Sequence, residues 1–407
     1  MSEMSYMEKL LEGVEVEWVA LGTVTQIKTG QSVNKDMIAQ NPGDYPVINS
    51  GRDPLGYIDQ WNTENDPIGI TSRGAGVGSI TWREGRYFRG NLNYAVSIKE
   101  EANLKTKFLL HLLLQMQREI QALCTYDGIP ALNAGSLKEL QIPIPCPEDP
   151  KRSLKIQSEI VRILDTFTEL TTELTTELTN RKRQYNHYRD QLLSFENGDV
   201  EWKTLGEVGE FIRGKRFTKS DYVERGISAI HYGEIYTHYG TSATETISQV
   251  RSEMEPALRF AKPGDVVMTG VGETVEDVGK AVAWLGLKPV AIHDDSYAFR
   301  HTMNAKYLSY YMQTGKFIRE KEVHVSCGKM KRLLISGVAK IFIPIPYPKD
   351  PKKSLAEQAR IAAILDKFDT LTHSISEGLP REIELRQKQY THYRDLLLSF
   401  PKPGVAA

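Results

Sequence analysis

The sequence lacks the features that mark secreted, membrane-spanning or metal-dependent proteins. Its 407 residues include three cysteines, Cys124, Cys146 and Cys327. They are too far apart for a zinc motif, and such low cysteine usage is typical of a reducing compartment. No apolar run is long enough to cross a bilayer, and the N-terminus lacks the basic start and apolar middle of a signal peptide. We therefore expect a cytoplasmic protein with no membrane partner.

The sequence also has no large excess of charge of one sign, and it lacks several common catalytic motifs. The formal net charge of -1 excludes a uniformly basic coat but leaves room for a local basic stripe. The sequence has no phosphate-binding P-loop and no H-E-x-x-H pair. "NPGDY" (41–45) lacks the second proline of a DNA amino-methyltransferase loop, and "RGAGVGS" (73–79) departs from the dinucleotide-binding glycine pattern. These absences predict a non-catalytic chain without a metal site, and His111 is interpreted as a helix-face histidine with no chemical role.

What the chain does contain is an internal duplication. "QYNHYRDQLLSF" (184–195) returns as "QYTHYRDLLLSF" (389–400), and "IPIPCPEDPKRSL" (142–154) returns as "IPIPYPKDPKKSL" (343–355). "VEWVALGTV" (16–24) also matches "VEWKTLGEV" (200–208). We interpret the order as globule, helix, globule, helix, related by a pseudo-two-fold. The predicted segments are a first globule at 17–141, a central helical spacer at 142–199, a second globule at 200–342 and a distal helical spacer at 343–400.

Both spacers carry the alternating three- and four-residue spacing of coiled coils. Helices are expected at about 153–195 and 354–400, starting at a Ser153 N-cap and a capping box of Ser354 with Glu357. A pseudo-two-fold predicts that they pair antiparallel, and two unrelated surface helices remain the alternative. The apolar positions of the first helix are Ile156, Ile160, Ile163, Phe167, Leu170, Leu174, Tyr185, Tyr188, Leu192 and Phe195.

The second helix differs from the first in its middle. There it reads "DTLTHSISEGLP" (369–380), and Gly378 with Pro380 predicts a break or kink. The first helix instead carries "TELT" three times in succession (168–179), and each unit adds about 6 Å to a helix. The apolar positions of the second helix are Ile364, Phe368, Leu371, Ile375, Leu379, Ile383, Tyr390, Tyr393, Leu397 and Phe400.

Together these features resemble the specificity subunit of type I restriction–modification enzymes. The duplicated "IPIP" and "QY.HYRD.LLSF" segments and the "TELT" repeats carry the resemblance, and "GDVVMTGVGETVEDVGKAVAWLG" (264–286) looks like a target-recognition segment of that family. The resemblance implies two target-recognition domains that each read half of a bipartite site in double-stranded DNA. It also implies that an antiparallel coiled coil spaces them and that the number of "TELT" units sets the gap.

The resemblance further implies the partners and the place of the cofactors. The expected partners are two methyltransferase subunits and the motor-nuclease restriction subunits. S-adenosylmethionine, ATP and magnesium belong on those subunits, so no cofactor is expected on this chain. Two other functions stay open at this point, a DNA methyltransferase in its own right and a coiled-coil adaptor that binds protein only.

Each globule is expected to be a compact α+β domain with a small, largely antiparallel sheet, because short strands precede amphipathic helices. Its candidate DNA contacts come from a glycine-rich loop, two basic clusters and two segments rich in histidine, tyrosine and acids. Tight turns, solvated charged faces and buried hydrogen-bonded groups are the alternatives. The candidates are Ser72, Arg73, Gly74, Arg213, Lys215, Arg216, Lys219, His231, Tyr232, Thr269, His293, Lys329, Lys331 and Arg332.

The repeated helix ends also predict a docking surface for a partner. Several residues that lie off the apolar seam are repeated although the globules have diverged. Two copies of one partner, bound at two equivalent places, explain this repetition, and pure coiled-coil packing is the alternative. The candidate docking residues are Gln184, His187, Arg189, Asp190, Gln389, His392, Arg394 and Asp395.

Overall fold

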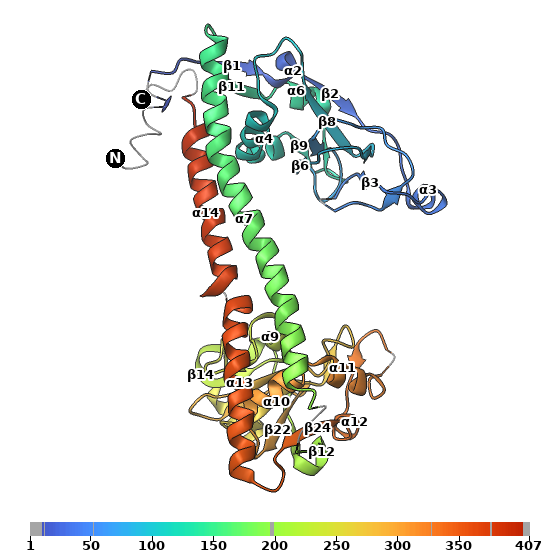
Figure 1. Cartoon of the computed structure of the whole chain (residues 1–407), viewed down its shortest axis with the longest axis vertical. Helices are drawn as coiled ribbons and strands as arrows, with labels where there is room; N and C mark the ends of the chain where they lie inside the picture. The colour runs from blue at the N-terminus through green and yellow to red at the C-terminus, as the bar shows by residue number, and fades with distance from the viewer. Residues whose placement is uncertain are drawn as a thin grey trace. The chain divides into compact units, whose positions relative to one another are not determined.

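A computed structural model describes residues 10–11, 13–51, 53–195, 199–326, 328–374 and 377–401 (Figure 1). The chain divides into two compact units. Unit 1 joins Met1–Glu173 with Glu384–Ala407, and unit 2 comprises Leu174–Ile383. Unit 1 is therefore built from both ends of the sequence. Within the described part of the chain, no helix has the length and apolar character needed to span a membrane.

The strands of unit 1 form one larger antiparallel sheet and several small ones. β1 (Val16–Ala20) pairs with β11 (Gln141–Pro145), so the predicted boundary at 141/142 falls inside a strand that remains part of the globule. The larger sheet has the order β2 (Thr25–Thr29), β8 (Asn93–Ile98), β5 (Ile68–Thr71), β6 (Ile80–Trp82). A second sheet has the order β4 (Tyr57–Ile58), β3 (Tyr45–Ile48), β7 (Phe88–Arg89), and β9 (Cys124–Thr125) pairs with β10 (Ala131–Leu132).

Short helices connect and cover these strands. The main one is α4 (Thr106–Gln115), whose apolar face is buried against the larger sheet through residues such as Phe108 and Leu112. The others are α2 (Leu21–Val24), α3 (Lys35–Gln40), α5 (Gln117–Ala122) and α6 (Ala134–Lys138). This arrangement confirms the expected α+β class.

Unit 2 repeats this plan with additions. β12 (Val200–Thr204) pairs with β24 (Phe342–Pro346), as β1 pairs with β11. Its larger sheet has the order β13 (Gly209–Arg213), β22 (Ser296–His301), β18 (Val266–Thr269), β20 (Ala281–Trp284), β15 (Ser242–Ala243). The second sheet has the order β16 (Ser248–Val250), β14 (Tyr222–Ile230), β21 (Val290–Ile292), β17 (Phe260–Ala261), and β19 (Val271–Gly272) pairs with β23 (Lys331–Arg332).

Short helices also connect and cover the strands of unit 2. They are α8 (Leu205–Val208), α9 (Tyr232–Thr237), α10 (Ala305–Tyr311), α11 (Gly315–Glu322) and α12 (Ile335–Val338), with 3₁₀ turns at Lys219–Asp221 and Ser252–Ala257. Matching contacts confirm the duplication at the level of single side chains. The Tyr94 hydroxyl donates to the Leu132 carbonyl at 3.0 Å, and the Tyr297 hydroxyl donates to the Leu333 carbonyl at 3.1 Å.

The long helices begin one turn earlier than the sequence predicted. α7 spans Pro150–Leu192 and α13 spans Pro351–His373. Asp149 and Asp350 accept hydrogen bonds from backbone N–H groups in the first turns, at 3.0 and 3.1 Å. The predicted caps at Ser153 and Ser354 are therefore wrong. The reason is the proline after each aspartate, because proline is well tolerated in the first turn of a helix.

Both serines instead lie inside their helices. Ser153 accepts from the Gln157 amide at 3.1 Å and Ser354 accepts from the Gln358 amide at 3.0 Å. The expected interruption of the second long helix is confirmed, since α13 ends at His373 and α14 spans Gly378–Leu398. Gly378 has a φ of 76°, and Pro380 sits in the first turn of α14. Ile375 lies outside the described residues.

The long helices pair antiparallel within each unit. In unit 2, Tyr185 of α7 contacts His373 of α13, and Tyr188 contacts Phe368. The residue numbers of the contacts decrease along α13 as they increase along α7, so the two helices are antiparallel. In unit 1, Phe167 stacks on Tyr393 with ring centroids 5.1 Å apart, and the α7 and α14 segments run in opposite directions (Figure 1). The predicted pairing is confirmed in both units.

The buried positions of α7 differ from the predicted seam. Leu164 and Leu193 are fully buried, whereas Ile163 is half-buried and Tyr188 is 44% exposed. Each segment of α7 packs on a second long helix and also on the globule of its unit. The buried face therefore covers more of the helix than the two positions per heptad of a simple coiled coil.

Candidate nucleic-acid interface

A loop that follows β13 brings most of the predicted basic residues of unit 2 together. Gly214 lies so close to β21 that a Cβ atom there would sit 2.1 Å from the His293 carbonyl oxygen, so only glycine fits. The next residue, Lys215, donates its backbone N–H to the Ile292 carbonyl at 3.0 Å. This contact fixes the path of the loop, and the side chains of Lys215, Arg216 and Lys219 are exposed.

Two histidines and two other aromatic residues lie directly beside this loop. The rings of His231 and His293 have centroids 4.6 Å apart, and the Tyr232 ring lies 4.4 Å from His231. Phe217, fully buried at the end of the basic loop, packs edge-on against His293 at 5.1 Å. The structure thus brings two segments predicted separately, "HYGEIYTHYG" (231–240) and "IHDDSYAFRH" (292–301), onto the same site as "IRGKRFTK" (212–219).

The backbone fixes the tautomer of both histidines. His231 Nδ1 accepts the Gly233 N–H at 3.1 Å, and His293 Nδ1 accepts the Asp295 N–H at 3.2 Å. The hydrogen of each neutral ring is therefore on Nε2. Burial, followed by the neighbouring His293, lowers the pKa of His231 to about 4, and burial also lowers the pKa of His293. Both rings are neutral at pH 7, so the positive charge of this surface comes from lysine and arginine.

Acidic residues orient the outer arginines of the site. The Nε atom of Arg213 donates to the Asp294 carbonyl at 2.8 Å. Arg332 lies 3.7 Å from the Asp295 carboxylate. We call Arg213, Lys215, Arg216, Lys219 and Arg332 the unit 2 basic surface. Lys329 is exposed and Lys331 is half-buried in β23, on the strand that also carries Arg332.

Two of the residues predicted to contact DNA in unit 2 are buried in the free chain, and their contacts with DNA stay predictions. Thr269 is fully buried, and its Oγ1 accepts the Gly279 N–H at 3.1 Å. His293 is only 7% exposed and shapes the site from beneath. Both lie in the strand and turn that support the surface, where apolar neighbours exclude solvent. His231 and Tyr232 are both half-buried and remain candidates for base contacts.

One group of side chains in this site has the atom types of a metal site. His293, Asp294 and Asp295 place one ligand atom each within 4.8 Å of one another. However, His293 Nδ1 already accepts a backbone hydrogen bond. A nitrogen whose lone pair accepts a hydrogen bond is a poor metal ligand. The donor set therefore does not support metal binding.

The glycine-rich loop of unit 1 keeps only one of its predicted contacts exposed. Arg73 is exposed, whereas Ser72 is buried and pairs through its backbone with Leu92 and Leu132. Burial leaves the Ser72 side chain little surface, and its contact with DNA stays a prediction. Gly74 has a φ of 97° and donates its N–H to the Pro130 carbonyl at 2.9 Å, so it serves the turn that presents Arg73.

A buried arginine in unit 1 was not predicted from the sequence. Arg89 is 2% exposed and donates to the Asp66 carbonyl at 2.7 Å, the Tyr94 carbonyl at 3.1 Å and the Asn93 amide oxygen at 2.5 Å. It also donates to the Tyr87 hydroxyl, and burial lowers its pKa. Arg89 and Asp66 line a cavity of about 260 Å³ together with residues that include Lys28 and Gln31. The short segment "FRGN" (88–91) gives no periodic signal that marks such burial.

The predicted docking residues divide into two groups. Gln184, His187, Gln389 and His392 are exposed, as expected for a surface that meets a partner. Arg189 is 8% exposed and lies over the Tyr185 ring, so the prediction that it stands off the seam is wrong. Its planar guanidinium can pack on an aromatic face and still bond to Asp190 at 2.8 Å, which is why burial is tolerated.

The equivalent pair shows the same packing in unit 1. Arg394 lies over the Tyr390 ring at 5.7 Å and bonds to Asp395 at 2.8 Å. Asp190 also accepts the Gly315 N–H at 3.2 Å, which ties α7 to α11. Part of the repetition in "QY.HYRD" is therefore explained by intramolecular packing, and the exposed Gln and His positions are what remains for a partner.

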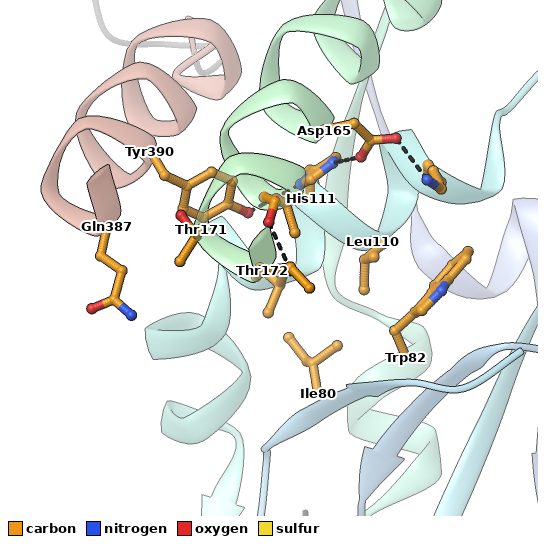
Figure 2. A pocket seen from close by; sticks show the side chains of 12 residues that line it. Ile80, Trp82, Leu110, His111, Asp165, Thr171, Thr172, Gln387 and Tyr390 are labelled. Carbon is orange, nitrogen blue, oxygen red and sulfur yellow. Dashed lines mark hydrogen bonds and ion pairs between the residues drawn. The ribbon is translucent and has the colours of Figure 1, made fainter. Parts of the chain in front are cut away.

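His111 has a structural role that its interpretation as a helix-face residue missed. It is 2% exposed, and its ring nitrogens lie 2.9 Å from an Asp165 carboxylate oxygen and 3.0 Å from the Tyr390 hydroxyl (Figure 2). Burial lowers its pKa although Asp165 acts in the opposite direction. The residue thus links α4 to both α7 and α14 within unit 1.

Comparison with known proteins gives the same result from the family model and from individual relatives. The model described as "Type I restriction modification DNA specificity domain" matches twice, over residues 13–181 and 197–385. The chain is 35% identical to the Escherichia coli type I restriction enzyme EcoR124I/EcoR124II specificity subunit, over the full length of both chains. It is 33% identical to a putative type I restriction enzyme specificity subunit of Haemophilus influenzae, covering 97% of this chain and 98% of the relative.

Solved structures show the same fold at low sequence identity. A type I restriction-modification S subunit from M. genitalium aligns with a TM-score of 0.56 and 19% identity, covering 96% of this chain and 98% of that one. A chain from a structure described as showing complex assembly and conformational transition of the type I R-M system aligns with a TM-score of 0.57 and 16% identity. That alignment covers 94% of this chain and 97% of the other.

The unit 2 basic surface makes a testable prediction about salt dependence. We expect the double substitution Arg216→Ala and Lys219→Ala to weaken DNA binding to all sequences alike, since phosphate contacts carry no base information. The slope of log K against log salt should fall by about 1 for each phosphate contact removed, as measured by fluorescence anisotropy between 50 and 200 mM salt. Lys352→Ala, in the first turn of α13, is the control and should leave the slope unchanged. An unchanged slope in the double variant would remove this surface from the interface.

Proposed function

Because the chain belongs to the family of type I restriction–modification DNA specificity proteins, we propose that it is the sequence-specific DNA-binding subunit of such a complex. Each of the two units reads one half of a bipartite site. The chain itself catalyses no reaction. Its partners are double-stranded DNA, two methyltransferase subunits and motor-nuclease restriction subunits, and the complex works in the cytoplasm.

The observation that carries this proposal is the composition of the unit 2 basic surface. Exposed Lys215, Arg216 and Lys219 offer phosphate contacts beside the neutral His231 and the polar edge of Tyr232. A neutral histidine with its hydrogen on Nε2 donates to guanine or thymine acceptors in the major groove. Charge for affinity and fixed donors for base reading are thus adjacent on one surface, as a sequence-specific reader requires.

The cofactors follow from the division of labour within the complex. S-adenosylmethionine is assigned to the methyltransferase subunits, and ATP with magnesium to the motor subunits. The support is chemical, because "NPGDY" (41–45) lacks the methyltransferase proline pair, and His293 Nδ1, one of the candidate metal donors, already accepts a hydrogen bond. Methyl transfer by the purified chain alone would instead establish the competing function, a DNA methyltransferase.

The "TELT" repeats are proposed to set the gap between the half-sites. α7 is one uninterrupted helix from Pro150 to Leu192, and the repeats occupy its middle. Threonine is a mediocre helix former, yet threonine hydroxyls here bond to carbonyls four residues earlier, as in Thr171 to Phe167 at 2.8 Å. The second long helix has no matching repeat and is interrupted after His373. Insertions and deletions of whole repeats are therefore expected to act through α7.

Deleting residues 172–175, one repeat, should shorten the recognised gap and leave both half-site sequences unaltered. Four helical residues correspond to about 6 Å, or roughly two base-pair rises. The measurement is selection from a random duplex library by the assembled complex, followed by sequencing. A duplication of the same four residues is the matched control and should lengthen the gap. A changed half-site sequence would contradict this account of the repeats.

The exposed residues of the repeated helix ends are proposed to dock the methyltransferase subunits. Changing Gln184 and His187 to alanine should weaken binding of one methyltransferase copy. Changing Gln389 and His392 to alanine should weaken binding of the other copy. The fold should survive, because these four side chains are exposed. Sizing chromatography with native mass spectrometry measures the stoichiometry. Unchanged assembly in the variant that carries all four substitutions would contradict the docking proposal.

A further inference from the structure

The two units differ at one edge of their larger sheets. In unit 2, β20 is paired on its outer edge with β15 in a parallel arrangement. The Ala283 N–H donates to the Thr241 carbonyl at 2.9 Å, and the Leu285 N–H donates to the Ala243 carbonyl at 2.8 Å. Ser309 of α10 also donates to the Thr241 carbonyl at 2.7 Å. A short strand therefore fills the groove between β20 and α10.

Unit 1 has the same groove, but the residues of unit 1 that the structure describes include no such strand. β6 corresponds to β20, because each pairs with the strand beside the one that carries Tyr94 or Tyr297. In unit 2 the long connection His231–Asp265 supplies α9, β15 and β16. In unit 1 the corresponding connection, Asn49–Pro67, is shorter, and its described residues supply the strand β4. Within the described part of unit 1, β6 pairs with β5 alone.

The outer backbone groups of β6 are therefore available for pairing. Thr71 N–H donates to the Ser79 carbonyl and Arg83 N–H donates to the Pro67 carbonyl, both at 2.9 Å. Inward and outward groups alternate along an antiparallel strand, so the N–H and C=O groups of Ile80 and Trp82 point away from β5. Trp82 occupies the position of Ala283, whose N–H binds β15 in unit 2. Open strand edges of this kind readily accept another strand.

The groove beside β6 is apolar and large enough for a side chain. It has a volume of about 410 Å³ and lies between β6, α4, α7 and α14, all within unit 1 (Figure 2). Leu110 and Leu114 of α4 line it. The equivalent residues of unit 2 are Ser309 of α10 and Gln313, just after α10, which both bond to Thr241. This exchange of polar for apolar residues favours an apolar side chain in the groove.

The rim of the groove is acidic. Lys107 lies 2.7 Å from the Asp165 carboxylate, and the hydrogen bond to Asp165, with further contributions from Glu84 and Glu169, raises the pKa of Lys107. Trp82 donates from its indole to Glu84 at 3.2 Å. The acidic groups that act on Lys107 thus outnumber it, and this excess complements a basic side chain on whatever enters the groove.

We propose that the groove beside β6 binds an extended segment of a partner protein, which adds to unit 1 as a strand parallel to β6. The segment places an apolar side chain against Leu110 and Trp82 and a basic side chain near Glu84 and Glu169. Main-chain hydrogen bonds supply affinity in this mode of recognition, and side-chain pockets supply specificity. In unit 2, β15 of the same chain already pairs with the equivalent edge of β20, so no partner segment is needed there.

The test measures binding of fluorescein-labelled heptapeptides to the full-length chain by anisotropy. The peptides carry Leu or Ser at the centre and Lys or Glu two positions later. The Leu–Lys peptide should bind about tenfold tighter than the Ser–Lys or the Leu–Glu peptide. The double variant Leu110→Ser, Leu114→Gln copies the unit 2 residues and should abolish the preference for Leu over Ser. Glu169→Lys, an exposed substitution, should abolish the preference for Lys over Glu.

Leu385→Gln, an exposed position on α14, is the matched control and should change neither preference. Equal binding of all peptides, or preferences unchanged in the groove variants, would overturn the proposal. So would strong exchange protection of the Trp82 amide in the free chain, because another part of this chain or a second copy would then cover β6. DNA binding is scored separately by gel shift, so loss of DNA binding in the wild-type chain would refute the proposed function without affecting this inference.

Discussion

The packing of α14 into unit 1 is the interaction on which the rest of the structure depends. Leu397 and Leu398, near the C-terminal end of α14, are almost fully buried among residues of α4 and α7 that lie more than 200 positions earlier. Burying one such side chain stabilises a fold by about 1.5–3 kcal/mol. The Trp18 indole adds a hydrogen bond of 2.8 Å to the Pro401 carbonyl. Unit 1 therefore cannot be completed until the end of the chain is in place.

This constraint accounts for the sequence feature that stands out most, the repeated "QY.HYRD.LLSF" segment. One copy lies on α7 and packs on the globule of unit 2, and the other lies on α14 and packs on the globule of unit 1. In each copy an arginine lies over a tyrosine ring, and two consecutive leucines pack against the globule. The acceptor on the opposite helix is duplicated as well. Asp165 accepts from Lys107 and is paired with His111, and Asp366 accepts from Lys306 and Tyr310. Both halves thus use one scheme to attach a divergent globule to a pair of helices.

The sequence predicted the duplication, the helix pairing and the interruption near Gly378, because periodicity, proline and glycine act locally. The predictions failed where contacts between segments distant in the sequence decide the structure. Asp149 and Asp350 cap the long helices in place of the predicted serines, and Thr269, a candidate DNA contact, is buried at the end of β18. Basic clusters indicated the unit 2 basic surface. Neither the contact between the rings of His231 and His293 nor the burial of Arg89 can be recognised from the linear sequence.

The most direct measurement is hydrogen exchange on a chain that ends at His373 and so lacks α14. The account predicts that the amides of α4 and of the first turns of α7 lose protection, because the core they share with Leu397 and Leu398 is removed. The amides of α10 and β18 in unit 2 should keep theirs, since α7 and α13 still pack on them. Full protection of α4 in the shortened chain would contradict the claim that the two ends of the sequence build one unit.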